Sequence, residues 1–189
     1  MLIRHADAAR DAAACAAIYA PFVRDTAVSL EEEAPDDGEL ATRIERISRT
    51  HPWLVADEDH EVLGFAYGSH HRERAAYRWA ADVAVYVDAG HRRAGIGRAL
   101  YEALLELLAR QGLRAACAGI TLPNPASVAL HQAVGFRPVG VYRRIGFKHG
   151  AWHDVGWWQV ELGSADDGPP GEPGPPVRLA GQRKAQPRS

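Results

Sequence analysis

One stretch near the middle of the chain constrains the fold more than any other, because it joins a strand, a glycine-rich turn and a long helix. The run VAVYV (83–87) is β-branched and apolar, as in a buried strand. The run RALYEALLELLARQ (98–111) repeats apolar residues at intervals of three and four, as one face of a helix requires. Gly95 and Gly97 lie between these runs, and two arginines precede them with one alanine between. A strand that leads straight into a helix indicates an α/β arrangement.

The flanking segments predict a mixed β-sheet with helices around it. Strands are expected at 2–5, 53–57, 61–68 and 115–120, and near 136–147 and 154–162. Helices are expected after Asp7 or Asp11, at 36–50 and at 125–134. We therefore expect a single α/β (α+β) domain over residues 1–162.

The composition changes near Gly163. The segment 163–189 is rich in proline and glycine, has almost no large apolar side chains and ends basic. Such a segment cannot bury enough apolar surface to offset the entropy lost on ordering. Residues 163–189 are predicted to be a disordered tail with no chemistry of their own.

Composition also narrows the class of protein. A chain of 189 residues that is 47% hydrophobic predicts one domain with a substantial core. The net charge of -2 argues against a general nucleic-acid-binding protein, which is normally basic. The first residues lack the pattern of a signal peptide, and no run approaches the ~20 apolar residues that cross a bilayer. We expect a cytoplasmic protein that binds neither nucleic acid nor membrane, with Cys15 and Cys117 as reduced, buried thiols.

Histidines are numerous, but their spacing does not indicate a metal site. His70 and His71 are adjacent, and His149 and His153 are four apart. Neither pair is accompanied by a cysteine or an acidic residue at a recurring ligand spacing. No metal ion is expected.

The glycine-rich turn has the features of an anion site. Glycines at 95 and 97 allow positive φ and let a ligand approach the main chain. The N–H groups of the first helical turn lack intrahelical partners and lie at the positive end of the helix dipole. Arg92, Arg93 and Arg98 add positive charge, so phosphate oxygens could be held here. The alternative is a loop that needs glycines only to enter the helix.

Two common phosphate motifs do not match this turn. A P-loop requires Lys and then Ser or Thr after its last glycine, whereas Gly97 is followed by Arg98 and Ala99. A dinucleotide-binding turn requires a third glycine where this chain has Leu100.

What the turn does match is Arg-x-x-Gly-x-Gly, at Arg92, Gly95 and Gly97. This pattern resembles the pyrophosphate-binding signature of the GNAT superfamily of N-acetyltransferases. LPNPASVALHQAVGF (122–136) resembles the second conserved stretch of that superfamily. Together with HPWLVAD, VYVDAGHRRAGIGRALY and GFKHGAWHDVGWWQ, it is similar to the phosphinothricin and methionine-sulfone acetyltransferase branch. The resemblance covers about residues 1–162.

The resemblance implies acetyl-CoA as co-substrate and assigns residues to it. The pantetheine arm would lie along the backbone of Val85, Tyr86 and Val87, as a strand adds to a sheet edge. Asn124 and Ser127 would lie near the thioester end. The pyrophosphate would be held at Arg92, Arg93, Ala94, Gly95, Ile96, Gly97 and Arg98.

It also implies direct acetyl transfer to a primary amine, with two catalytic candidates. The amine must lose a proton before it attacks, and Asp82 stands where relatives commonly have Glu. Asp82 could take that proton directly or through water, or could be only a hydrogen-bond acceptor at the strand entry. His131 could protonate the departing thiolate, or could be a helix residue that orders the site.

The acceptor is implied to be a small amino-acid analogue such as phosphinothricin, methionine sulfone or methionine sulfoximine. The segment 69–82 precedes the predicted strand at 83–87, and its arginines could bind a carboxylate or phosphinate. Residues assigned to this acceptor are Arg72, Arg74, Ala75, Ala76, Tyr77, Arg78 and Phe22, together with Lys148 and Trp152 on a loop near a homodimer partner.

Two alternatives remain at this point. A protein N-terminus, a polyamine or an aminoglycoside would want an acidic cleft, and the basic run 72–78 disfavours these cationic acceptors. A non-catalytic acyl-CoA sensor would keep the turn but lack a working base.

Overall fold

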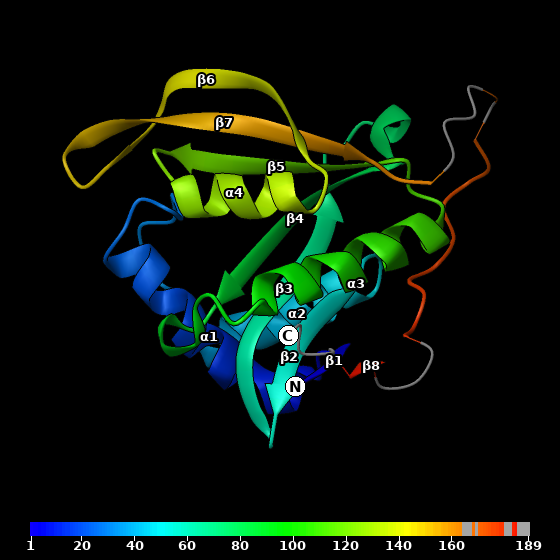
Figure 1. Cartoon of the computed structure of the whole chain (residues 1–189), viewed down its shortest axis with the longest axis horizontal. Coiled ribbons are helices and arrows are strands. Elements are labelled where there is room, and N and C mark those ends of the chain that lie inside the picture. The colour runs from blue at the N-terminus through cyan, green and yellow to red at the C-terminus, as the bar shows by residue number, and fades with distance from the viewer. Residues whose placement is uncertain (164–167, 169, 180–182, 185–189) are drawn as a thin grey trace.

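One twisted sheet runs through the computed structural model, which describes residues 1–163, 168, 170–179 and 183–184, with helices on both faces of the sheet (Figure 1). The strands lie in the order β6-β7-β5-β4-β3-β2-β1-β8. Among the described strands, only β4 and β5 pair in parallel, and the other neighbours are antiparallel. The mixed sheet expected from the sequence is therefore confirmed. The strands are β1 (Leu2–His5), β2 (Trp53–Glu58), β3 (Glu61–His70), β4 (Ala80–Val87), β5 (Ala115–Leu122), β6 (Arg137–Lys148), β7 (Ala151–Glu161) and β8 (Arg183–Lys184).

The helices begin in two different ways. They are α1 (Ala8–Arg24), α2 (Asp37–Ser48), α3 (Ile96–Gln111) and α4 (Pro125–Ala133), with short 3₁₀ turns η1 (Ala75–Tyr77) and η2 (Ala89–His91). The side chains of Asp7, Asp36 and Asn124 each accept a hydrogen bond from a first-turn N–H of α1, α2 and α4. Helix α3 instead has Gly95 at its N-cap position, and Gly95 has no side chain that could accept these hydrogen bonds. The amides at the start of α3 are thus left for another acceptor.

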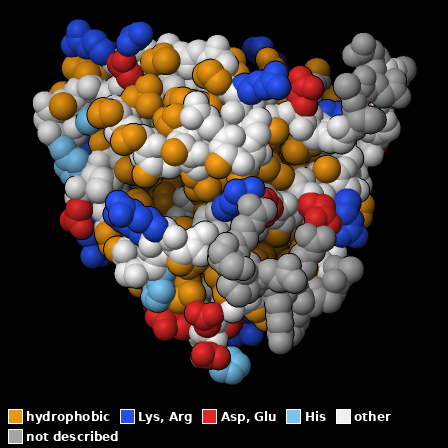
Figure 2. Space-filling model, viewed as in Figure 1, with side chains coloured by type: hydrophobic (Ala, Val, Ile, Leu, Met, Phe, Trp, Pro, Cys, Tyr) orange, Lys and Arg blue, Asp and Glu red, His pale blue; other side chains and the backbone are white. Residues whose placement is uncertain are grey.

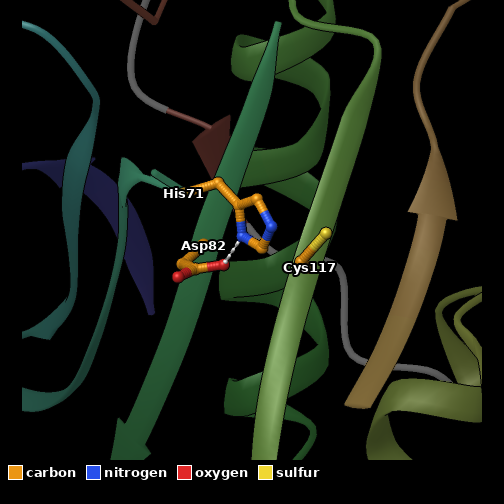
Figure 3. A group of neighbouring side chains, drawn as sticks. All are labelled: His71, Asp82 and Cys117. Carbon is orange, nitrogen blue, oxygen red and sulfur yellow. Dashed lines mark hydrogen bonds and ion pairs between the residues drawn. The ribbon is translucent and has the colours of Figure 1, made fainter. Parts of the chain in front are cut away.

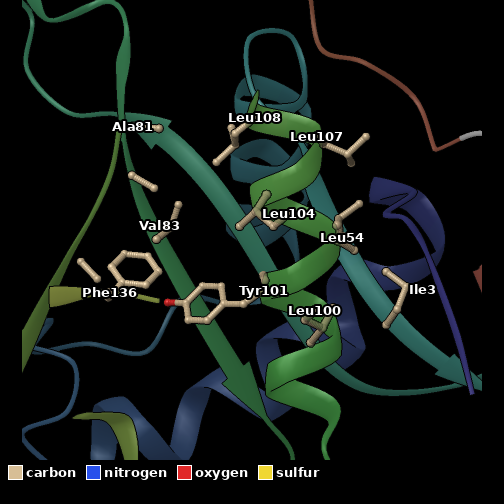
Figure 4. Close-up of a cluster of buried hydrophobic side chains, with 14 of the residues drawn as sticks. Ile3, Leu54, Ala81, Val83, Leu100, Tyr101, Leu104, Leu107, Leu108 and Phe136 are labelled. Carbon is tan, nitrogen blue, oxygen red and sulfur yellow. The ribbon is translucent and has the colours of Figure 1, made fainter. Parts of the chain in front are cut away.

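Helix α3 covers one face of the sheet and α1 with α2 the other. Figure 4 shows Leu100, Leu104 and Leu108 of α3 directed toward the strands, where Leu54 and Val83 meet them. These side chains are buried because apolar residues recur along α3 at the helical period. The opposite face packs Cys15, Ile18 and Val23 of α1 and Leu40 and Ile44 of α2 against β2 and β3. The sheet is the middle layer of the domain.

Both cysteines are free thiols, as expected, but only one of them is buried. Cys15 on α1 is buried, whereas Cys117 on β5 is half-buried and not fully buried as expected. Among the described residues, no helix combines the length and apolar character needed to span a bilayer.

The hairpin of β6 and β7 forms one edge of the sheet and exposes apolar side chains. Hydrophobic side chains gather in the upper half of Figure 2, where β6, β7 and α4 lie. The exposed large apolar residues of this hairpin are Val139, Val141, Tyr142, Ile145, Phe147 and Trp152.

The C-terminal segment differs from the expected disordered tail. Residues 170–179 lie against the domain: Glu172 forms two 2.7 Å hydrogen bonds with Arg78, and the N–H of Gly174 donates to the carbonyl of Gln111. Val177 and Leu179 pack on the larger core cluster. The rest of the expected tail, at 164–167, 169, 180–182 and 185–189, lies outside the described residues. Composition does not predict this packing. Two apolar residues and a few hydrogen bonds hold the segment, and neither produces a periodic pattern in the sequence.

Candidate active site

Strands β4 and β5 separate in the middle of the sheet. Their parallel pairing extends only from Ala80 opposite Ala115 to Asp82 opposite Cys117. Beyond these residues, a small cavity of about 60 Å³ lies between them. Its lining includes Val85 from β4, Gly119 from β5 and His131 from α4. Backbone groups of β4 in this gap could pair with an extended ligand.

The glycine-rich turn lies at the far end of the same gap. Gly95 has φ of 79°, and a Cβ there would meet nothing within 4 Å, so the turn opens onto free space. Arg93 also has positive φ, of 67°. Gly97 differs from the expectation, because it lies inside α3 and a Cβ there would lie 3.1 Å from Leu130. Gly97 therefore allows close packing of α3 on α4, whereas Gly95 supplies the turn.

Most residues assigned to acetyl-CoA surround a cavity of about 590 Å³ at this turn. Asn124 lies on its edge, with Oδ1 accepting the N–H of Ser127 at the start of α4. Arg98 also forms a 2.7 Å bond with Glu102 on α3. Of the assigned residues, only Ala94 is outside the lining, which includes Val85, Tyr86, Val87, Arg92, Arg93, Gly95, Ile96, Gly97, Arg98, Asn124 and Ser127.

A third and larger cavity, of about 890 Å³, lies on the face of the sheet covered by α1 and α2. Its aromatic wall comes from Tyr19, Trp53, Phe65, Tyr67 and Tyr86. Its charged wall comes from Glu31, Glu39, Arg43 and Arg46. Arg43 holds both carboxylate oxygens of Glu31 at 2.8 and 2.9 Å and lowers the pKa of Glu31. The sequence does not predict this cavity. Its signals there are the acidic run after Leu30 and two arginines three apart on one predicted helix.

Tyr86 on β4 lines all three cavities. Ser69, which lines the large cavity, lies opposite Asp82 in the β3–β4 register. The turn, the gap between β4 and β5 and the large cavity thus meet along one strand.

Asp82 lies at the point where β4 and β5 separate. Its Oδ1 lies 2.6 Å from Nδ1 of His71, and Arg72 lies 4.0 Å from its other oxygen. Partial burial raises the pKa of the Asp82 carboxyl, while His71 and Arg72 oppose that shift. Figure 3 shows the His71 ring between Asp82 and Cys117. Nothing in the sequence singles out His71 among the histidines, since no pattern in the chain joins it to Asp82.

His131 is buried in α4 with both ring nitrogens engaged. Nδ1 lies 2.7 Å from the carbonyl oxygen of Ser127, and Nε2 lies 2.9 Å from the hydroxyl of Tyr101. A carbonyl only accepts, so Nδ1 carries the proton and Nε2 accepts from Tyr101. Burial lowers the pKa of His131, which favours the neutral ring.

The arginines assigned to the acceptor are not brought together. Arg72 lies beside Asp82, with its guanidinium 5.6 Å from the Trp157 ring centre. Arg78 lies over Trp79 and is occupied by Glu172, so the expected grip on a substrate carboxylate is not available at Arg78. Arg74 precedes the exposed turn η1, which holds Ala75, Ala76 and Tyr77, and the Tyr77 ring centre lies 5.7 Å from that of His71.

Three further assigned residues lie away from the expected positions. Phe22 packs edge-on against Tyr86 and lines the cavity at the turn rather than the large cavity. Lys148 ends β6 and is buried, with Nζ donating to the carbonyls of Val23 and Ser29 at 2.6 and 2.8 Å. Trp152 lies on β7, packed on Phe147. Lys148 and Trp152 are therefore strand residues and not loop residues, and the ammonium group of Lys148 is used inside the protein.

The start of α3 is open to a phosphate group, and the parallel strands β4 and β5 separate next to the pair of His71 and Asp82. This combination is that of an acyl-CoA-dependent transferase. The family model described as the acetyltransferase (GNAT) domain matches residues 3–157. The chain belongs to the GNAT acetyltransferase family.

Individual relatives agree with this assignment. The chain is 41% identical over 160 residues to a phosphinothricin N-acetyltransferase of Streptomyces viridochromogenes, covering 85% of this chain and 87% of that one. It is 34% identical to an L-methionine sulfoximine/L-methionine sulfone acetyltransferase of Salmonella typhimurium, covering 86% and 95%. A phosphinothricin acetyltransferase from Sinorhizobium meliloti, solved in complex with acetyl-CoA, matches with a TM-score of 0.85 and 37% identity, covering 90% and 92%. The protein is an N-acetyltransferase with acetyl-CoA as co-substrate.

Proposed function

We propose that the enzyme acetylates the α-amine of a small amino-acid analogue of the phosphinothricin or methionine sulfone type. The observation that carries this proposal is the junction at Tyr86, where the cavity at the turn meets the large cavity. A coenzyme held at the turn would place its thioester in the gap between β4 and β5. An acceptor in the large cavity would then lie on the other side of the same strand.

The lining of the large cavity suits a zwitterion with an apolar body. It presents carboxylates, guanidinium groups and aromatic rings within one volume. Arg43 is already paired with Glu31 and Glu39. Arg46 is therefore the guanidinium group of this wall that would bind a carboxylate or phosphinate through paired N–H bonds, while the aromatic rings would contact a short aliphatic chain. A polyamine or an aminoglycoside carries only positive charge, and the wall offers it no excess of carboxylates, because Glu31 and Glu39 are both paired with Arg43.

The open start of α3 would hold the pyrophosphate. First-turn amides after Gly95 point outward at the positive end of the helix, and Arg92 and Arg93 line the same cavity. The backbone of Val85 and Val87 would bind the pantetheine arm. Asn124 and Ser127 would lie near the thioester.

Deprotonation of the amine would take place at Asp82, directly or through a group next to it. The carboxylate lies at the point where the strands part, with 31% of its side chain exposed. His131 would order the site rather than donate to the thiolate, because both of its nitrogens are engaged.

The hairpin of β6 and β7 would form the contact of a homodimer. Its exposed apolar side chains, among them Val139, Ile145 and Phe147, would be covered by a second copy.

A turnover assay tests the proposed acceptor. Thiol release from acetyl-CoA is followed with methionine sulfone, methionine sulfoximine and phosphinothricin, and in parallel with spermidine, an aminoglycoside and a peptide with a free N-terminus. We expect turnover with the first group, at a kcat/KM at least tenfold above that of the second. A preference for the cationic acceptors would contradict the proposal, and no turnover with any of them would favour the acyl-CoA sensor.

A further inference from the structure

His71 occupies the mouth of the gap between β4 and β5. It follows the last residue of β3, and its side chain crosses to Asp82 on β4. Asp82 and Cys117 are the last register pair before the strands part, and Figure 3 shows the imidazole between them. The ring therefore lies at the start of the gap, and Ser69, which lines the large cavity, lies opposite Asp82 in the β3–β4 register.

The groups around the ring leave one nitrogen available as a base. A carboxylate accepts hydrogen bonds, so the 2.6 Å contact places a proton on Nδ1 of His71. A neutral imidazole with its proton on Nδ1 carries its lone pair on Nε2.

The neighbours of the ring support this state. Arg72 lies 4.0 Å from the second oxygen of Asp82 and favours the ionised carboxylate. The ligand-type atoms of His71, Asp82 and Cys117 lie within 4.8 Å of one another, and burial raises the pKa of Cys117, so the thiol stays neutral. The ring of Tyr77 packs edge-to-face against the ring of His71.

We propose that His71 is the catalytic base of acetyl transfer and that Asp82 is a positioning residue that orients it and balances its charge. This inference rests on the proposed function only in placing the amine on this face of the sheet. With His71 as the base, the proton-accepting atom is Nε2, on the side of the imidazole ring opposite the Nδ1 that binds Asp82.

The proton path balances without a further reactant. Nε2 of His71 takes one proton from the substrate ammonium, and the imidazolium pairs with the carboxylate of Asp82. The lone pair of the substrate amine then forms a C–N bond to the thioester carbonyl carbon, and the C–S bond breaks. The second proton leaves the nitrogen as the tetrahedral intermediate collapses, and the thiolate takes up one proton. Each transfer yields the amide, free coenzyme thiol and one proton, which passes from His71 to solvent.

The test compares His71→Gln with wild type. Glutamine can keep a hydrogen bond to Asp82 but has no basic nitrogen. We expect kcat to fall by about 100-fold or more, the acetyl-CoA KM to change by less than about threefold, and the acid limb of the pH profile of kcat/KM to be lost. His60→Gln, in the exposed turn between β2 and β3, is the matched control and should behave as wild type.

A rescue experiment separates a chemical from a structural role. Added imidazole should restore part of the lost rate of His71→Ala. It should leave the rate of His60→Gln unchanged, because that variant is expected to be as active as wild type. Circular dichroism and acetyl-CoA calorimetry establish that both His71 variants fold and bind coenzyme. If neither does, His71→Asn, assayed in the same way, replaces them.

Three results would overturn the assignment. The first is a folded His71→Gln enzyme with wild-type kcat and an unchanged pH profile. The second is activity that EDTA abolishes and Zn²⁺ restores, because the same nitrogen and carboxylate would then hold a metal ion. The third result applies if wild type acetylates no acceptor, which would contradict the proposed function. A base at His71 would also activate water for hydrolysis of acetyl-CoA. Equal hydrolysis by wild type and His71→Gln would therefore overturn the role of His71 separately.

Discussion

The hydroxyl of Tyr101 on α3 lies 2.9 Å from Nε2 of His131 on α4, and this bond joins the two helices behind the gap between β4 and β5. Both side chains are almost fully buried. Because Nδ1 of His131 donates to the carbonyl of Ser127, the ring has one fixed tautomer and one fixed orientation. The bond thus links the helix that begins at the glycine turn to the helix that carries Asn124.

Replacing Tyr101 by Phe should destabilise the protein. The change leaves Nε2 of His131 buried without its donor, which costs about 1–3 kcal/mol in the free energy of unfolding. Urea denaturation followed by circular dichroism measures the loss. Tyr142→Phe removes a hydroxyl from an exposed ring on β6 and is the matched control. Equal midpoints for both variants would mean that the bond to His131 contributes nothing.

Replacing Gly95 by Ala should weaken coenzyme binding for a backbone reason. A Cβ at Gly95 meets nothing within 4 Å, so crowding is not the cause, but φ of 79° costs a non-glycine residue about 1–2 kcal/mol. The strain is relieved when the turn changes shape, which moves the amides at the start of α3. We expect a rise of about tenfold in the acetyl-CoA Kd by calorimetry.

Gly140→Ala is the control for that variant, because Gly140 also has open space around a Cβ and its φ is not positive. An unchanged Kd in Gly95→Ala would separate the turn from the coenzyme site.

The sequence predicted the elements well where one local signal decides them. Residues 2–5 form β1 as predicted, and Leu40 and Ile44 set the buried face of α2. The turn was found because glycines and arginines stand next to each other in the chain. Asp7 and Asp11 could both have capped α1: Asp7 does so, while Asp11 is buried and bonds both terminal nitrogens of Arg4.

The parts of the site that the sequence did not reveal depend on contacts between distant residues. His71 and Asp82 are 11 residues apart, and only the β3–β4 register and the side-chain orientations bring them to 2.6 Å. Lys148 reads as an exposed cation near a turn, yet its partners lie 125 and 119 residues earlier in the chain. Arg78 was assigned to a substrate because its partner Glu172 lies in a segment whose composition gives no packing signal.

His51 should make stability depend on pH. Burial, aided by the nearby His70, lowers the pKa of His51 from 6.5 to about 4. The unfolded chain therefore takes up this proton at a higher pH than the folded protein does. The stabilisation is fully present above pH 6.5 and is lost as the pH falls toward 4. Between pH 7 and 5 this group should remove about 2 kcal/mol from the free energy of unfolding.

His51→Gln tests that dependence, since glutamine does not titrate. Urea denaturation at pH 7 and 5 should show a smaller loss in the variant than in wild type. His60→Gln, whose side chain is exposed, should keep the wild-type difference. A variant His51→Gln that loses as much stability as wild type over this range would assign the pH dependence to other groups.

Replacing Lys148 by Met distinguishes a structural cation from a substrate ligand. The ammonium joins the end of β6 to the end of α1 and to the segment after it, through the carbonyls of Val23 and Ser29. Methionine fills similar space but leaves both carbonyls without this donor, at a cost of about 2–4 kcal/mol in the free energy of unfolding. Arg143→Met removes an exposed cation from the same strand and should leave the unfolding midpoint unchanged. If Lys148 instead bound the acceptor, Lys148→Met would keep its stability and raise the acceptor KM, so denaturation and steady-state kinetics on the same two variants decide between the roles.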